Sequence, residues 1–75
     1  MAGLLVTVLP GIGPVWGAEL NENGIMFASQ IYGQFLWMNQ DEGRFTGWLQ
    51  QQCGIGPAYA GRVYHALQGW SQHHL

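Results

Sequence analysis

Charged side chains are scarce in this chain of 75 residues, and lysine is absent altogether. Only 8% of the residues are charged, whereas soluble domains average about 25%. The basic residues are Arg44 and Arg62, and the formal net charge is −2. A surface with so little charge has weak self-repulsion, so we expect the chain to associate with itself or with a partner. The acidic balance also disfavours nucleic acid, whose binding depends on Lys and Arg neutralising phosphates.

Patterns of catalytic or metal-ligating residues are missing as well. Cys53 is the single cysteine, which excludes a disulfide within the chain. The Cys and His residues do not have the spacing of a zinc site, and no Ser/His/Asp or Cys/His order of a hydrolase can be recognised. No Gly-Lys-Ser/Thr follows the glycine-rich turns, as a nucleotide-binding loop would require. We therefore expect no enzymatic activity, no catalytic residue, no metal and no cofactor.

Long apolar runs are missing too. The length predicts one domain, residues 1–75, with a core small enough that a partner chain would help to stabilise it. Residues 1–10, MAGLLVTVLP, are apolar but too short to span a bilayer, and they lack the basic start of a signal peptide. We interpret residues 1–9 as a short buried element or an arm onto a neighbouring subunit, in preference to a membrane contact.

Glycine and proline mark the boundaries of the first predicted helices. Pro14 suits the first position of a helix, and Gly24 suits the left-handed position after a helix end. We therefore expect a short helix from Pro14 to about Asn23. Between residues 27 and 38 apolar side chains recur at spacings of four, four and three, which predicts a second helix with one buried face. These side chains are Phe27, Ile31, Phe35 and Met38.

The second half of the chain predicts two further helices. Asn39 is a candidate N-cap, and Glu42 three residues later would complete a capping box. That helix is expected to end at Cys53 and Gly54, and the last helix to begin at Pro57. Their apolar residues are Phe45, Trp48 and Leu49, then Val63, Ala66, Leu67 and Trp70. With short loops between the helices, the sequence predicts an all-α fold, a compact bundle of short helices.

A Gly-Ile-Gly-Pro turn occurs twice, at residues 11–14 and 54–57. The first, in LPGIGPVWGAEL, resembles the helix-hairpin-helix consensus, in which glycines permit unusual backbone angles and the isoleucine points inward. The N–H groups of such a hairpin and of the following helix can face a phosphate. The candidate DNA contacts are Gly11, Ile12, Gly13, Val15 and Ala18. A brace between helices without any ligand is the alternative, and the lack of basic neighbours favours it.

The same stretches resemble the barrier-to-autointegration factor family. The resemblance covers residues 9–75 without a gap, and its strongest pieces are Gly11-Ile12-Gly13, Gly33-Gln34-Phe35-Leu36, Asp41-Glu42, Phe45, Trp48-Leu49, Cys53-Gly54, Leu67, Trp70 and Leu75. It implies a SAM-like helical bundle with a helix-hairpin-helix. It also implies a homodimer that binds and bridges duplex DNA without sequence preference and that binds LEM-domain proteins. The resemblance suggests the nucleus or cytoplasm, while the low charge leaves an extracellular location open.

The chain departs from this family at the positions where the family contacts phosphates. The resemblance places lysine pairs at Ala18-Glu19 and Asn39-Gln40 and an arginine at Gly61, and none of these residues is basic here. We also expect the family's first helix to be missing from this chain. Neutral backbone N–H groups position a protein on DNA but seldom supply enough affinity. The sequence therefore predicts negligible DNA binding at physiological salt.

Aromatic residues make up 13% of the chain and indicate a protein interface. Large aromatic side chains are enriched at interface centres, and Trp37 and Tyr59 are expected to be exposed. The candidate interface residues are Trp37, Tyr59, Gly33, Phe35, Trp16 and Ile55, although Trp16 could also fill the core. We predict a non-enzymatic structural protein that forms a homo-oligomer, either a dimer or a filament built from contacts that do not close. The alternative is a chromatin-associated dimer that binds double-stranded DNA through the hairpin.

Overall fold

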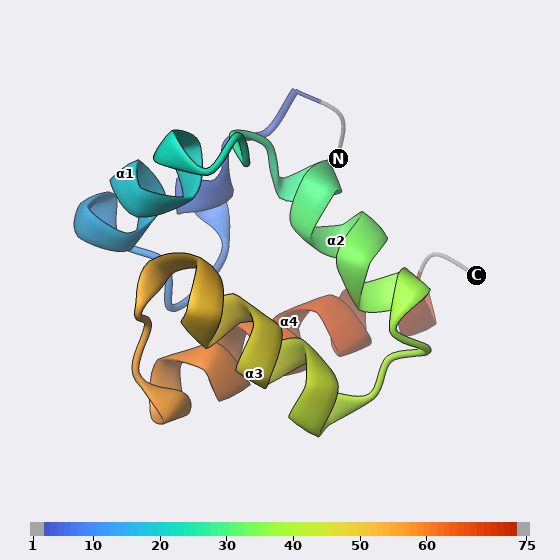
Figure 1. The fold of residues 1–75 in the computed structure, drawn as a ribbon. Coiled ribbons are helices and arrows are strands. Elements are labelled where there is room, and N and C mark those ends of the chain that lie inside the picture. The colour runs from blue at the N-terminus through green and yellow to red at the C-terminus, as the bar shows by residue number, and fades with distance from the viewer. Residues whose placement is uncertain (1–2, 74–75) are drawn as a thin grey trace.

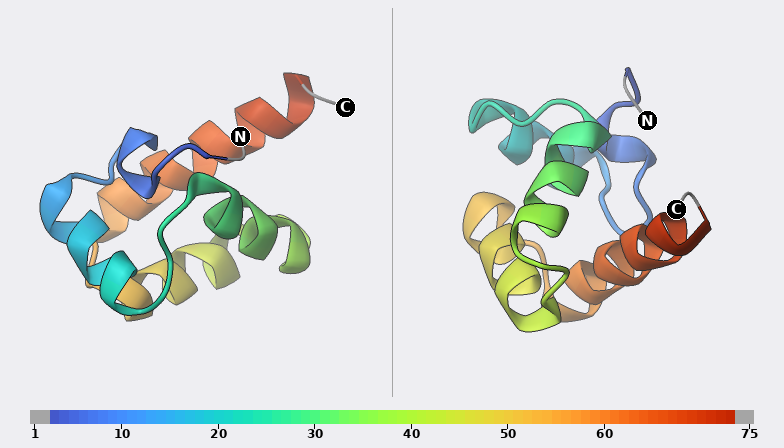
Figure 2. Two further views of the ribbon diagram at one scale, coloured as in Figure 1. Left: turned by 90° about the horizontal axis from the view of Figure 1, so that it is seen from above. Right: turned by 90° about the vertical axis from the view of Figure 1, so that its right-hand side faces the viewer.

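The computed structural model describes residues 3–73, which form an all-α bundle, as predicted. The elements are a short 3-10 helix η1 (Val6–Val8) and the helices α1 (Pro14–Glu22), α2 (Ala28–Trp37), α3 (Glu42–Cys53) and α4 (Pro57–His73). Figure 1 shows α3 and α4 packed side by side, with α1 and α2 over them. The two further views of Figure 2 show the helices arranged around a single interior.

Glycine and proline bound the helices where the sequence predicts. Helix α1 begins at Pro14, and Gly24 follows its end with a φ of 82°. Helix α3 ends at Cys53, where Gly54 has a φ of 73° and donates its N–H to the Gln50 carbonyl at 2.8 Å. Both glycines occupy left-handed conformations that a side chain would strain. These predicted helix ends are therefore confirmed.

The N-cap of α3 differs from the predicted one. Asn39 and Gln40 have φ values of 57° and 59°, so the chain makes a left-handed turn before the helix. An N-cap residue needs an extended backbone, and Asp41 has it, with φ −73° and ψ 119°. The Asp41 Oδ1 accepts the N–H of Arg44 at 2.8 Å. The prediction of Asn39 as the cap is wrong, because sequence spacing does not reveal the left-handed turn.

This cap gives a direct stability test. We expect Asp41→Ala to lower the free energy of unfolding by about 1 kcal/mol, because the N–H of Arg44 loses its acceptor. Asp41→Asn is the matched control, since asparagine caps about as well as aspartate. Urea denaturation of the two variants measures the difference. Equal losses in both variants would show that the Asp41 carboxylate acts in some way other than as a cap.

The core is centred on aromatic rings from three helices. Phe35 of α2, Phe45 of α3 and Tyr64 of α4 are buried, and the Phe35 ring lies 5.7 Å from the Phe45 ring and 5.5 Å from the Tyr64 ring. The Tyr64 hydroxyl donates to the Gln40 carbonyl at 2.7 Å and so fixes the turn before α3. Phe27, predicted on the buried face of α2, is instead its exposed N-cap residue.

The segment before the hairpin packs against the helices of the same chain. The Val6 N–H donates to the Met26 carbonyl at 3.0 Å, and the Ala28 N–H donates to the Leu4 carbonyl at 2.7 Å. The Val6 side chain is buried. The described part of residues 1–9 thus packs on the helices of its own chain. None of the helices within residues 3–73 is long and apolar enough to cross a membrane.

Candidate functional site

The hairpin before α1 packs directly on the start of α4. Gly11 has a φ of 95°, and a Cβ built on it would lie 2.8 Å from the backbone oxygen of Tyr59. Only glycine fits this approach, because any side chain would meet the α4 backbone. Ile12 is buried, as predicted, and its N–H donates to the Leu9 carbonyl at 3.1 Å. The hairpin is therefore held in one conformation by the core beneath it.

The N-terminus of α1 presents backbone donors beside the hairpin. An α-helix leaves its first N–H groups without an intrahelical partner, and here these groups belong to Val15 and Trp16, because Pro14 has no N–H. The next N–H, that of Gly17, donates to the Gly13 carbonyl at 2.8 Å. Val15 and Ala18 are exposed. The N–H groups of Val15 and Trp16 can donate hydrogen bonds to an anion. The first turn of the helix adds no charged side chain to them.

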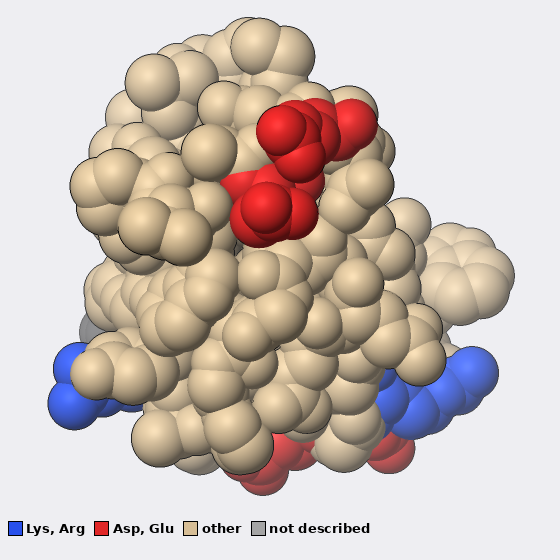
Figure 3. All heavy atoms as spheres, turned by 60° about the vertical axis from the view of Figure 1, so that its left-hand side comes forward, with Lys and Arg blue, Asp and Glu red and all other residues tan. Residues whose placement is uncertain are grey.

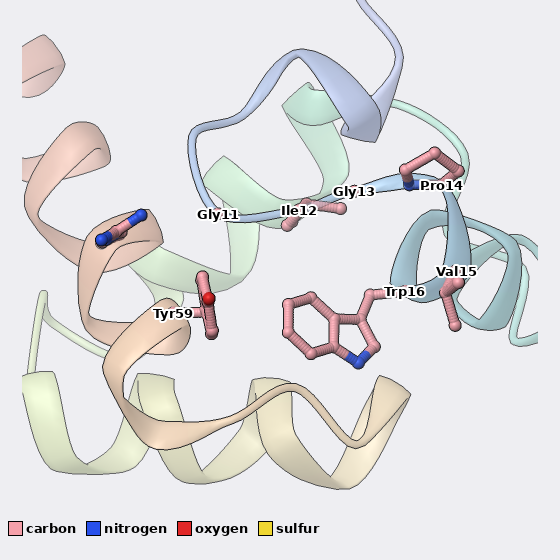
Figure 4. A pocket seen from close by; sticks show the side chains of 8 residues that line it. Gly11, Ile12, Gly13, Pro14, Val15, Trp16 and Tyr59 are labelled. Atoms are coloured by element: carbon pink, nitrogen blue, oxygen red, sulfur yellow. The ribbon is translucent and has the colours of Figure 1, made fainter.

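A groove of about 670 Å³ lies between the hairpin and α4, which we call the hairpin groove. In Figure 4, the side chains of Trp16 and Tyr59 lie next to one another in this groove, with ring centroids 5.2 Å apart and ring planes tilted by 55°. The Arg62 guanidinium lies 5.2 Å from the centre of the Tyr59 ring, a cation–π contact. The lining residues are Gly11, Ile12, Gly13, Pro14, Val15, Trp16, Tyr59 and Arg62. The groove is thus mostly apolar and carries one positive charge.

Arg62 belongs to this site although the sequence did not predict it. Its place depends on how α4 packs on the hairpin, where a Cβ built on Gly11 would lie 3.4 Å from the Arg62 Cβ. One signal was available, because residues three apart on a helix share a face, and Arg62 lies three residues after Tyr59. The predicted helix from Pro57 therefore indicates that the Arg62 side chain lies beside the Tyr59 ring.

Charges are thinly spread over the surface. In the view of Figure 3, carboxylates form separate groups, and the arginines lie at the lower edges. Among the described residues, the one salt bridge joins His65 Nε2 to Glu42 Oε2 at 3.7 Å, with both side chains more than half exposed. An exposed pair of this kind contributes little stability. No group of three or more His, Cys, Asp or Glu residues in the described part of the chain could hold a metal ion.

Cys53 belongs to the core. Its thiol is buried and donates to the Leu49 carbonyl, with 3.4 Å between sulfur and oxygen. Burial, with a smaller contribution from the Glu19 carboxylate, raises the pKa of the Cys53 thiol above its ordinary value of 9.0. At neutral pH the thiol is therefore protonated, and it is a poor nucleophile.

The candidate interface residues fall into two sets at the surface, one of which includes the half-buried Trp16, and one buried set. Gly33 and Trp37 lie four residues apart on one face of α2, and the Trp37 side chain is 74% exposed. Tyr59 and Trp16 line the hairpin groove on another part of the surface. Phe35 and Ile55 are buried, so neither side chain can contact a neighbouring copy.

The expectation for Phe35 and Ile55 is therefore corrected. Phe35 follows Ile31 by one helical turn on the inward face of α2 and packs on the ring of Phe45. Ile55 occupies the same position in the second Gly-Ile-Gly turn as Ile12 does in the first, and both isoleucines anchor their turns in the core. The repeated motif thus reflects two similar turn anchors.

Comparison with known proteins identifies the family. The chain matches the family model of barrier to autointegration factor over residues 1–74. It is 40% identical over 65 residues to a barrier-to-autointegration factor of Danio rerio, covering 87% of this chain and 72% of that protein. It is 33% identical over 66 residues to barrier-to-autointegration factor 1 of Caenorhabditis elegans, covering 88% and 74%, and 37% identical over 62 residues to the Homo sapiens protein, covering 83% and 70%. With its helical bundle and glycine hairpin, the chain belongs to the barrier-to-autointegration factor family.

Proposed function

We propose that this chain is a non-enzymatic structural protein that self-assembles into homo-oligomers on a barrier-to-autointegration factor scaffold. The observation that carries the proposal is Trp37, a tryptophan with 74% of its surface exposed on a face that holds no charged side chain. Gly33 lies one helical turn before Trp37, and the exposed Leu36 directly precedes Trp37 in α2. We call Gly33, Leu36 and Trp37 the α2 surface. Exposed apolar patches of this kind are typical of protein interaction sites.

Low charge supports association of the chain with itself. A net charge of −2 gives little repulsion between copies. The hairpin groove adds a second apolar area, with Tyr59 at its edge 44% exposed. Tryptophan and tyrosine are among the residues that most often dominate binding energy at interfaces. A symmetric dimer needs only one such area, because both copies use the same patch. Two such areas on one small domain therefore favour assembly beyond a dimer.

The hairpin has too little positive charge for stable binding to DNA. Affinity for duplex DNA arises largely from counterions released when Lys and Arg neutralise phosphates. Arg62 is the one cation that lines the hairpin groove, while the exposed Glu19 of α1 would repel a phosphate. A single neutralised phosphate gives a salt dependence of only about −0.9 in log–log slope. We therefore propose that this protein does not bind DNA at physiological salt.

The second candidate function is a chromatin-associated dimer that binds double-stranded DNA without sequence preference. The observation in its favour is that Arg62 lies beside the hairpin whose backbone donors Val15 and Trp16 can face a phosphate. In this alternative Gly11, Ile12, Gly13, Val15 and Ala18 form the contact surface, with neutral N–H groups as its main donors. A LEM-domain protein would be the further partner that the family resemblance implies.

Fluorescence anisotropy of a labelled duplex separates these two candidates. We expect no rise in anisotropy with micromolar protein at about 0.15 M salt, the physiological range. The same titration at low salt would show at most a weak interaction, since one arginine cannot neutralise many phosphates. Micromolar affinity at physiological salt would instead favour the DNA-binding dimer.

A further inference from the structure

We propose that the hairpin groove binds a linear segment of another protein, in which a large apolar side chain neighbours a carboxylate. The groove lies within one copy of the chain, between the hairpin, the start of α1 and the start of α4 (Figure 4). Binding of such a segment is a function beyond self-assembly, because a single copy carries the complete site. A bound segment would cover an area that is otherwise open to a neighbouring copy.

Two aromatic rings provide the apolar part of the site. Trp16 lies in the first turn of α1 and Tyr59 in the first turn of α4, and their ring planes are tilted by 55°. Rings that meet at such a tilt leave part of each face free, and Tyr59 is exposed at the surface. A further ring packs favourably on such a pair, with centroids about 4.5–7 Å apart. At about 670 Å³, the groove has room for one large side chain.

Arg62 provides the charged part of the site. Its side chain is exposed, with the guanidinium 5.2 Å from the centre of the Tyr59 ring. Among the residues that the structure describes, it forms no salt bridge with a carboxylate. A guanidinium has five N–H donors, and a carboxylate can accept two of them at once. The group that complements this part of the groove is therefore an Asp or Glu side chain beside the apolar one.

The open form of the groove favours a protein segment over a small molecule. Small-molecule sites enclose most of the ligand surface, whereas Tyr59 and Val15, at the two ends of the groove in Figure 4, are both exposed. A Cβ built on Gly13 would meet no atom within 4 Å, so no side chain blocks the hairpin backbone there. A peptide that continues beyond the groove can add contacts along this backbone. One arginine suffices for one carboxylate, whereas duplex DNA requires several cations.

Selection from a phage-displayed library of random linear peptides tests the site. We expect the selected peptides to share a large apolar residue close to an Asp or Glu. A labelled copy of one selected peptide is then titrated with dilute protein and followed by fluorescence anisotropy. We expect Arg62→Glu to weaken binding about ten- to a hundredfold, the equivalent of a charge-assisted hydrogen bond. Tyr59→Ala should weaken it about thirtyfold, as for a truncated hot-spot residue.

Arg44→Glu is the matched control, because it makes the same change in net charge at an exposed arginine outside the groove. It should bind the peptide like the parent protein, and circular dichroism checks the fold of each variant. A peptide with Gln in place of its acidic residue repeats the test on the unchanged protein. Three results would overturn the proposal: a library that yields no such shared residues, a Gln peptide that binds equally well, or equal losses in Arg62→Glu and Arg44→Glu. Displacement of the peptide by duplex DNA at physiological salt, or by further copies of the chain, would also overturn it.

Discussion

Replacing Ala18 and Glu19 with lysine is expected to turn this protein into a binder of duplex DNA. Both positions are exposed on α1, close to the hairpin donors, and the family resemblance places a lysine pair there. The change moves the net charge from −2 to +1, since lysine replaces one neutral and one acidic residue. A charge-assisted hydrogen bond contributes about 1.5–3 kcal/mol, which is about ten- to a hundredfold in affinity for each lysine that contacts a phosphate.

The salt dependence and a matched variant test the mechanism. Two new phosphate contacts should steepen the log–log salt slope by about 2. Asn21→Lys with Glu22→Lys makes the same change in net charge at the far end of the same helix, so it controls for charge alone. Anisotropy titrations at several salt concentrations compare the two variants. If both gained affinity equally, the hairpin would not be the DNA-contact surface.

Phe35→Ala is expected to destabilise the fold severely. Phe35 is fully buried, and its ring contacts those of Tyr32, Phe45 and Tyr64. Truncation of a core phenylalanine costs about 3–5 kcal/mol. A domain of this length has a total stability of about 4–11 kcal/mol. The variant should therefore lose much of its cooperative unfolding transition, even at concentrations where no oligomer forms.

The exposed Trp37 provides the control for this prediction. Trp37→Ala should leave the free energy of unfolding of the dilute protein within about 0.5 kcal/mol of the parent value, as is usual for surface substitutions. Urea denaturation at low protein concentration measures both variants. A stable Phe35→Ala protein that fails only to associate would contradict this prediction.

Local signals in the sequence were sufficient for most of the helices. Pro14 and Pro57 mark helix starts, and Gly24 and Gly54 mark the residues after helix ends, because each residue type limits the local backbone angles. The N-cap of α3 could not be predicted in the same way. Its position depends on the left-handed turn at Asn39, which is fixed by a hydrogen bond from Tyr64 that lies far away in the sequence.

The candidate site was only partly predictable. The hairpin could be recognised from its glycines, and helical spacing already placed Phe35 on the buried face of α2. The groove could not be recognised, because it forms where α4 packs on Gly11 and brings Tyr59 and Arg62 beside Trp16. Contacts between elements distant in sequence have no local signal. For the same reason the burial of Ile55 was visible only by analogy with Ile12.

Light scattering of the purified protein over a concentration series, with and without a short DNA duplex, tests most directly whether the protein assembles by itself. We expect the mass to rise with protein concentration without DNA, and the duplex to change nothing at about 0.15 M salt. A constant mass that increases only when the duplex is added would contradict this expectation. That result would mean that backbone donors and Arg62 suffice for DNA binding, and that the scarcity of charge does not decide the function.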